Sequence, residues 1–242
     1  MGLADLHIHS LYSWDGIVPV ASILAYAVKT AGLQVVAITD HNRIEGALEA
    51  LELAPDYGVE VVPGCEVSTA DGHLLALFVT GAIPAGLSLQ ETVAHVKELG
   101  GLCVAPHPEA GKASLSLSEA AITQALQDPE ARETLVGIES YNAGNVGWLY
   151  RDGNPRARRL TERLRLAHLG ASDAHMLPAI GSGKTFFPGK TAQELRNALV
   201  QRQTRAVEGT LPGAVQWLGR WMVGVLAHAT GWTRLARLFG LL

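Results

Sequence analysis

Short apolar runs alternate with longer segments of helical periodicity along most of the chain. The apolar runs are rich in β-branched residues and have the length of buried strands. They span residues 4–8, 35–39, 59–64, 74–79, 102–105, 136–140 and 166–172. Helical patterns lie between most of these runs and after the last one, at residues 20–31, 44–54, 89–99, 117–127, 155–165 and 191–201.

This repeated alternation of strand and helix predicts parallel strands joined by crossover helices. Seven strands with about six helices favour a (β/α) barrel over a short open sheet. The order breaks once, where Ala70-Asp71-Gly72 predicts a tight hairpin between the third and fourth strands. We therefore expect an α/β fold with a barrel domain at residues 1–201 and a helical tail at residues 202–242.

The composition is that of a folded protein with one large core. The 242 residues are 48% hydrophobic and 17% charged, which argues against disorder. Cys65 and Cys103 provide no disulfide framework, so a reducing compartment is the simple interpretation. The N-terminus lacks the charged and apolar regions of a signal peptide. We expect a cytoplasmic protein.

Charge is unevenly distributed along the chain. The formal net charge of −4 argues against stable binding of duplex nucleic acid. From Arg202 to the end, however, there are five arginines and a single acid, Glu208. An acidic body with a basic tail implies separate roles for the two parts.

Chemically active side chains recur where the predicted strands end. In a (β/α) barrel the active site lies at the C-terminal ends of the strands. Nearly every predicted strand places an imidazole or a carboxylate there or in the loop that follows. These residues are His7, His9, Asp15, Asp40, His41, Glu66, His73, His107, Glu139, Asp173 and His175.

Two pairs in this set have the spacing of joint metal ligands. His7 and His9 are two positions apart on a strand, so both can reach one centre, and Asp173 and His175 repeat the arrangement. Imidazoles and carboxylates are common ligands of zinc, manganese and iron. The set exceeds the needs of one tetrahedral ion and suits two or three ions, with Glu66 bridging a pair.

Other charged residues near these motifs allow two interpretations. Arg43 and Lys184 are candidate phosphate contacts, and an exposed loop charge is the alternative for each. Asp40 is expected to orient a neighbouring imidazole, and Glu139 to support the ligands or the phosphate. The GSGKT segment is not a nucleotide-binding loop, because Pro178 stands where the first glycine is required. His95, His168 and His228 lack such partners and are expected to be structural or exposed.

The ordered motifs DLHIHS, ITDHN, GCEVS, APHP and GASDAH resemble those of the polymerase and histidinol phosphatase (PHP) superfamily of metal-dependent phosphoesterases. The resemblance covers about residues 3–187 and is closest to the small stand-alone phosphoesterases. It implies a distorted (β/α)7 barrel. It also implies a metal-ligand set of His7, His9, Asp15, His41, Glu66, His73, His107, Asp173 and His175.

The resulting hypothesis is hydrolysis of a phosphate monoester or diester, with a nucleotide or oligonucleotide among the candidate substrates. A hydroxide generated by two or three metal ions would attack the phosphorus. Two alternatives stay open. One is a metal-dependent hydrolase of a carbon–nitrogen bond, and the other is a metal-binding module without catalytic activity.

The tail at residues 212–242 has an amphipathic pattern of its own. At about 100° per residue, one stripe collects Trp217, Trp221, Val225, His228, Trp232 and Phe239. The three arginines lie away from that stripe. A helix on an anionic membrane surface is one interpretation, and a helix packed on the barrel or on a second subunit is the other.

Overall fold

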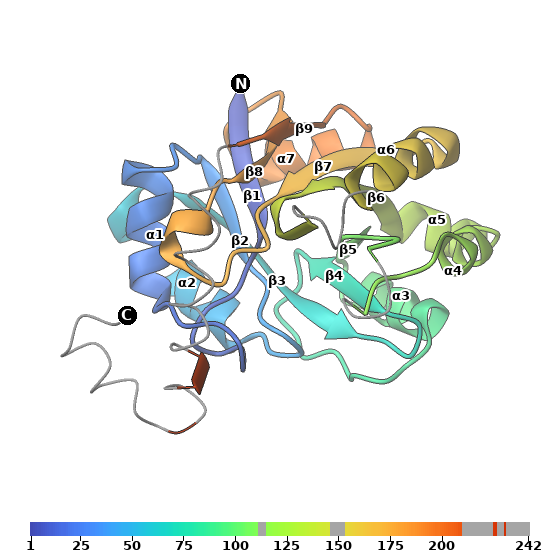
Figure 1. The fold of residues 1–242 in the computed structure, drawn as a ribbon, viewed down its shortest axis with the longest axis horizontal. Helices are drawn as coiled ribbons and strands as arrows, with labels where there is room; N and C mark the ends of the chain where they lie inside the picture. The colour runs from blue at the N-terminus through green and yellow to red at the C-terminus, as the bar shows by residue number, and fades with distance from the viewer. Residues whose placement is uncertain (111–114, 146–152, 210–224, 227–229, 231–242) are drawn as a thin grey trace.

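Nine strands form one curved sheet in the computed structural model, which describes residues 1–110, 115–145, 153–209, 225–226 and 230 (Figure 1). Their order across the sheet is β7-β6-β5-β4-β3-β2-β1-β8-β9. The strands are β1 (Gly2–Ile8), β2 (Val35–Ile38), β3 (Glu60–Ser68), β4 (His73–Leu77), β5 (Leu102–Ala105), β6 (Leu135–Asn142), β7 (Ala167–Ala171), β8 (Gly183–Phe187) and β9 (Arg205–Glu208).

The strand directions divide the sheet into two parallel parts joined by an antiparallel one. β1, β2 and β3 are parallel, and so are β5, β6 and β7. β4 runs antiparallel to both of its neighbours, so the predicted hairpin between the third and fourth strands is confirmed. β8 is antiparallel to β1 and to β9.

The sheet curls until β7 meets β8, which gives a nearly closed barrel. At this seam, the Thr185 hydroxyl donates to the carbonyl of Gly170 at 2.9 Å and accepts from its N–H at 3.1 Å. Two glycines permit the close approach. A Cβ atom on Gly170 would lie 2.3 Å from the carbonyl oxygen of Lys184, and one on Gly183 would lie 2.0 Å from that of Ala171. The predicted distorted barrel is confirmed.

Helices cover the outside of the sheet, with α1 and α2 on one side and α4, α5 and α6 on the other (Figure 1). Local signals set several of their starts. Ser88 with Glu91 and Thr191 with Glu194 form capping boxes. The helices are α1 (Val20–Lys29), α2 (Glu45–Tyr57), α3 (Leu89–Glu98), α4 (Glu119–Ala125), α5 (Pro129–Thr134), α6 (Gly153–Leu164) and α7 (Ala192–Val200).

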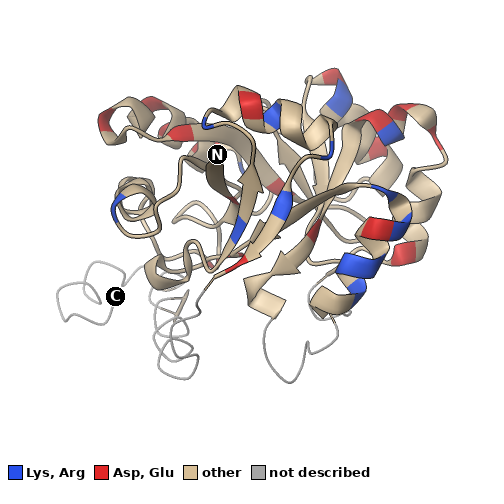
Figure 2. Cartoon of the chain, turned by 90° about the horizontal axis from the view of Figure 1, so that it is seen from above, with Lys and Arg blue, Asp and Glu red and all other residues tan. Residues whose placement is uncertain are grey.

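The two faces of the sheet carry separate apolar cores. One core packs the strands against α1 to α6 and includes Ile23, Leu24 and Ile38. The other combines the opposite face with α7 through Leu195 and Leu199, and includes the fully buried Phe187. Charged residues of both signs are interspersed over the helices of the described chain (Figure 2).

Three elements were not expected from the sequence. β8 and β9 extend the sheet beyond the seven predicted strands, and α5 follows α4 directly. β9 is an exposed edge strand that carries Arg205 and Glu208, so it lacks the apolar run that marks a buried strand. The amphipathic stripe expected at residues 212–242 lies outside the described residues except at 225, 226 and 230. Within the described part, none of the helices is long and apolar enough to span a membrane.

Candidate metal centre

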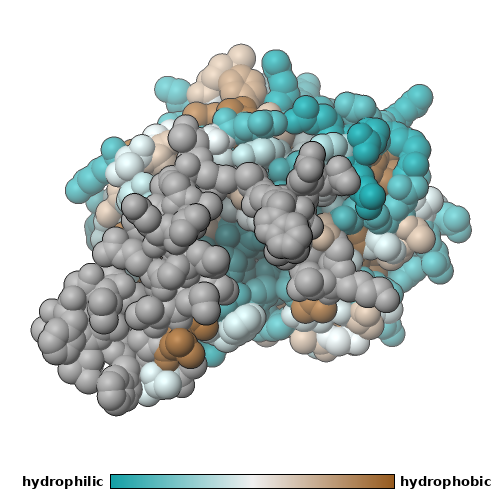
Figure 3. All heavy atoms as spheres, in the orientation of Figure 1, coloured by the Kyte–Doolittle hydropathy of each residue, from teal (hydrophilic) through white to brown (hydrophobic). Residues whose placement is uncertain are grey.

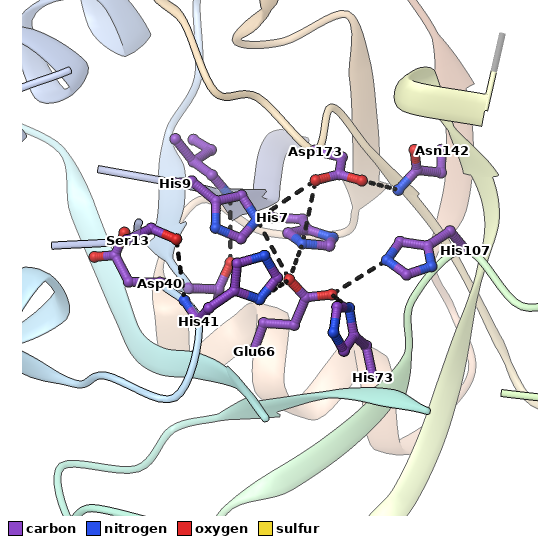
Figure 4. Close-up of polar contacts among 12 residues, drawn as sticks. His7, His9, Ser13, Asp40, His41, Glu66, His73, His107, Asn142 and Asp173 are labelled. Atoms are coloured by element: carbon purple, nitrogen blue, oxygen red, sulfur yellow. Dashed lines mark hydrogen bonds and ion pairs between the residues drawn. The ribbon is translucent and has the colours of Figure 1, made fainter. Parts of the chain in front are cut away.

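All nine residues predicted as metal ligands meet at the ends of the barrel strands. Figure 4 labels seven of them, all except Asp15 and His175. His7 and His9 lie at the end of β1, His41 follows β2, Glu66 is on β3, and His107 follows β5. The remaining residues are Asp15 in the loop after β1, His73 at the start of β4, and Asp173 and His175 after β7.

Their ligand atoms form four overlapping groups, and within each group the atoms lie within 4.8 Å of one another. Several residues belong to two groups, so the groups are parts of one cluster. The groups are His9, Asp15, His41 and His175; His7, His9 and Glu66; His7, His107 and Asp173; and His41, Glu66 and His73.

The carboxylate of Glu66 contacts five imidazoles (Figure 4). Around Oε1 are His73 Nδ1 at 3.0 Å and His107 Nε2 at 3.1 Å. Around Oε2 are His41 Nδ1 at 3.1 Å, His7 Nε2 at 3.2 Å and His9 Nε2 at 3.4 Å. Because its two oxygens face different histidines, this carboxylate is placed to bridge two ions.

The hairpin explains how His73 reaches this cluster from the beginning of a strand. β4 runs antiparallel to β3, and His73 pairs with Ser68, so the start of β4 lies beside the end of β3. Thr69 closes the turn through a hydrogen bond from its hydroxyl to the carbonyl of Gly72. Gly72 has a φ of 139° and lies against the backbone of Ser116, which leaves no room for a side chain.

Backbone strain occurs at two residues of the cluster. His107 has a φ of 30° and Asp173 a φ of 54°, both unusual for residues with a side chain. The N–H of His107 is held by the carboxylate of Glu139 at 2.9 Å. Such conformations persist only where surrounding contacts enforce them, and they concentrate at functional sites.

The buried histidines and carboxylates of this cluster shift one another's pKa values. Burial alone would raise the pKa of Glu66, but without metal ions the charge of His7 and the close contacts of His107 and His73 hold it well below its usual range. Burial would likewise lower the pKa of His175, whereas its contact with Asp15 raises the pKa to about 9. His9 is the exception, because burial and the neighbouring His175 lower its pKa to about 4.

Four imidazole nitrogens in the cluster are buried and have no hydrogen-bond partner within the described part of the chain. They are His7 Nε2, His9 Nδ1, His9 Nε2 and His41 Nδ1. A buried polar atom without a partner is costly, and native proteins rarely leave one unsatisfied. Three of these nitrogens lie 3.1–3.4 Å from the same oxygen, Oε2 of Glu66. Imidazole nitrogens gathered with a carboxylate oxygen form the donor set of a divalent metal site. The residues therefore fit bound metal ions.

Glu139 contacts two residues of the cluster, His7 and His107, which is the supporting role expected from the sequence. Its Oε1 lies 2.8 Å from Nδ1 of His7, and its Oε2 accepts from the N–H of His107. Asn142, which the sequence did not single out, donates to Glu139 at 2.7 Å and to Asp173 at 3.4 Å. Its position three residues after Glu139 at the end of β6 is the only signal that could have identified it.

Ser13 is a second supporting residue that the sequence did not identify. Its hydroxyl donates to Oδ1 of Asp15 at 2.6 Å. The other oxygen of Asp15 lies 3.0 Å from Nε2 of His175 and 3.3 Å from Nε2 of His41. Ser13 thus fixes the carboxylate that joins the first and last motifs.

Asp40, Arg43 and Lys184 have other partners in the structure. Asp40 accepts from the backbone N–H and the hydroxyl of Ser10 at 2.6 and 2.7 Å, so it anchors the end of β1 and does not orient an imidazole. Burial raises the pKa of Asp40 to about 6. The half-exposed Arg43 pairs with Glu45. The ammonium group of Lys184 donates to the carbonyl of Ala31 at 2.9 Å.

A cavity of about 250 Å³ opens onto the cluster. Hydrophilic residues are visible in the hollow near the middle of this face (Figure 3). Among the described residues that line the cavity there is no lysine or arginine. Asn145 lines it with a buried Nδ2 group that has no hydrogen-bond partner among the described residues. The described lining is completed by Trp14, Asp15, His41, Glu66, His73, His107, Leu115, Gly144, Asp173 and His175.

The histidines expected to be structural lie apart from this cluster. His95 is on α3 near Glu98, and His168 is a partly buried residue of β7. Burial lowers the pKa of His168. His228 lies outside the described residues.

Comparison with known proteins shows which families and proteins this chain resembles. A family model described as the PHP domain matches residues 5–165, and one described as PHP-associated matches residues 151–204. An uncharacterised protein of Methanocaldococcus jannaschii is 41% identical over 160 residues, which cover 62% of this chain and 84% of that protein.

Two further similarities concern proteins with a stated chemistry. A phosphoribosyl 1,2-cyclic phosphate 1,2-diphosphodiesterase of Eggerthella lenta is 37% identical over 89 residues, covering 34% of this chain and 33% of that enzyme. A two-domain Bacteroides vulgatus protein containing a predicted PHP-like metal-dependent phosphoesterase superposes with a TM-score of 0.70 at 20% identity. That superposition covers 86% of this chain and 65% of the other.

Proposed function

Because the chain belongs to the PHP domain family, we propose that it hydrolyses phosphate esters at a centre of two or three divalent metal ions. The observation that carries this proposal is the contact of Glu66 with five imidazoles that belong to overlapping ligand groups. The same donor set suits zinc, manganese or iron. A small phosphorylated compound or a nucleotide is the proposed substrate.

Different residues of the chain would hold the metal ions and the substrate. Bound divalent ions supply Lewis acidity towards phosphoryl oxygens and lower the pKa of water. Glu66 keeps the imidazoles of His7, His9 and His41 directed at one point. Glu139 fixes the ring of His7 from its far side.

Asn145 is proposed as a hydrogen-bond donor to the phosphate. Its Nδ2 group is buried, lines the cavity and has no partner among the described residues. A neutral donor held in place where charge develops stabilises a phosphoryl transition state without reorganisation. It supplies hydrogen bonding in a cavity whose described lining includes no lysine or arginine.

Hydrolysis of a carbon–nitrogen bond is the second candidate. Clustered imidazoles and carboxylates also serve that chemistry in metal-dependent hydrolases. A lysine at the ligand cluster would favour it, but no lysine is found among the described residues that line the cavity. The phosphate ester proposal is therefore preferred.

Metal analysis combined with turnover measurements tests this proposal. Purified protein is assayed for bound zinc, manganese and iron, and for hydrolysis of p-nitrophenyl phosphate, bis-p-nitrophenyl phosphate and an anilide substrate. We expect phosphate ester hydrolysis that is lost, together with bound metal, in the double variant His7→Ala/His9→Ala. His95→Ala, which alters a histidine on the outer helix α3, is the matched control and should keep both. Full activity in the double variant would contradict the proposal.

A further inference from the structure

An exposed tryptophan stands at the mouth of the metal-centre cavity. Trp14 lines that cavity, yet 67% of its surface is exposed. Its neighbours Ser13 and Asp15 are 1% and 5% exposed. The loop after β1 thus sends two polar side chains into the centre and one large aromatic ring towards solvent. An isolated exposed apolar side chain is ordinary, but one at the rim of a polar cavity is placed to contact a ligand.

Backbone contacts close the loop that carries this ring. The N–H of Ser13 donates to the carbonyl of Ser10 at 3.1 Å, and that of Gly16 donates to the carbonyl of Ser13 at 3.3 Å. A Cβ atom on Gly16 would lie 1.9 Å from the carbonyl oxygen of Ser10, so the turn is tightly closed. The indole of Trp14 is inclined by 19° to the ring of His41, with their centroids 6.1 Å apart. One edge of the cavity is therefore a preformed aromatic surface.

A second exposed apolar side chain lies at the same cavity. Leu115, in the segment between β5 and α4, lines it and is 57% exposed. The other strongly exposed apolar residues of the described chain, such as Met1 and Val200, do not line this cavity. Trp14 and Leu115 are thus exposed to solvent at the mouth of a cavity whose interior is lined mainly by carboxylates and imidazoles.

This combination suits a substrate with a charged end and a planar apolar end. The phosphate would occupy the polar interior, as in the proposed function, and the remainder of the molecule would leave through the mouth. A sugar phosphate would present a small surface rich in hydroxyl groups, which buries less apolar area against Trp14 and Leu115 than a planar base does. The base of a nucleoside would instead cover the indole face, and such stacking is worth about 1–3 kcal/mol per base.

We propose that the substrate is a nucleoside phosphate and that Trp14 is the stacking platform for its base, an inference that rests on the proposed phosphoesterase function. In this assignment the metal centre and Asn145 recognise the phosphate, whereas Trp14 and Leu115 recognise the base. Stacking accepts any base, because every base has a π face. Selectivity among bases is therefore expected to be weak.

Binding of AMP and of ribose 5-phosphate tests this assignment, because the two probes differ only in the base. Both are titrated calorimetrically into the metal-loaded protein, and phosphate release is followed in parallel. Wild-type protein is expected to bind AMP about tenfold more tightly than ribose 5-phosphate. In Trp14→Ala this preference falls to less than twofold, and in Trp14→Phe most of it is kept. Val200→Ala, which truncates an exposed apolar residue away from the cavity, should retain the wild-type ratio.

The outcomes separate this inference from the proposed function. Equal affinity for the two probes in wild-type protein, or an AMP preference that survives in Trp14→Ala, would overturn the role of Trp14. Absence of hydrolysis of every phosphate ester would instead count against the phosphoesterase function. The ratio of the two dissociation constants would still be measurable in that case, since it does not depend on turnover.

Discussion

The Nδ1 atom of His7 lies 2.8 Å from Oε1 of Glu139, and both side chains are completely buried. The second oxygen of Glu139 accepts from the N–H of His107 and from Nδ2 of Asn142. Because donors surround its second oxygen, Glu139 is held in place, and its first oxygen accepts a hydrogen bond from the Nδ1–H of His7. That leaves the Nε2 lone pair of His7 directed at Glu66 and Asp173.

Replacing Glu139 by glutamine should weaken metal binding about 10- to 100-fold. The amide would bring an NH2 group towards the donors of His107 and Asn142, so the ring of His7 would lose its fixed orientation. Competition with a chelating dye measures the metal dissociation constant. Glu133→Gln, on the exposed surface of α5, serves as the control. An unchanged dissociation constant in folded Glu139→Gln protein would show that His7 needs no such support.

The metal-free protein should lose stability as the pH rises from about 6.5 to about 9. The pKa of His175 is raised to about 9 by Asp15, against an ordinary value of 6.5. A raised histidine pKa contributes stability that is complete below the unfolded value and is lost as the pH passes the folded value. The midpoint of thermal unfolding, measured after chelator treatment, should therefore fall more steeply with pH in wild-type protein than in His175→Gln. Parallel pH profiles would refute this linkage.

Replacing Asn145 by alanine should lower kcat/KM for phosphate esters about 100-fold, the loss that follows removal of one donor to a developing oxyanion. Metal content should stay at the wild-type value, because within the described chain no hydrogen bond or ion pair joins Asn145 to a residue of the four ligand groups. Steady-state kinetics with metal analysis on the same samples separates the two effects. If metal is lost along with activity, Asn145 acts on the centre and not on the phosphate.

Replacing Gly183 by alanine should destabilise the barrel by about 2 kcal/mol, within the range for overpacking a tight contact. Its new Cβ would lie 2.0 Å from the carbonyl oxygen of Ala171, at the seam between β7 and β8. Urea unfolding measures the change in free energy. Gly81→Ala is the control, because its Cβ would meet only the flexible side chain of Leu99 at 3.1 Å. A seam that tolerates Gly183→Ala without loss would be looser than its geometry indicates.

The parts of the fold that were predicted are those in which a local pattern matches a local structure. Buried strands such as β2 and β5 are continuous apolar runs, and the turn at Ala70-Asp71-Gly72 has a recognisable composition. β9 was missed because an exposed edge strand has no such run. α5 was missed because Asp128 and Pro129, which begin it, also occur in ordinary turns.

The residues of the centre were predictable because they follow strands, whereas their partners were not. His41 and His107 follow β2 and β5 within three positions, and parallel strands end at the same rim. Asn142 and Ser13 are small polar residues of types common in any loop, so only the folded chain shows what they contact. The same holds for Lys184, whose partner Ala31 is 153 positions away.

The hairpin of β3 and β4 also bears on how the centre is assembled as the chain folds. Glu66 and His73 are seven positions apart, so a short loop closure brings them together at small entropic cost. Asp5, by contrast, anchors Gly181 across 176 positions, a contact that forms only once the distant segment before β8 has reached β1. Local contacts form faster than distant ones. We therefore expect the contact between Glu66 and His73 to form before the barrel closes.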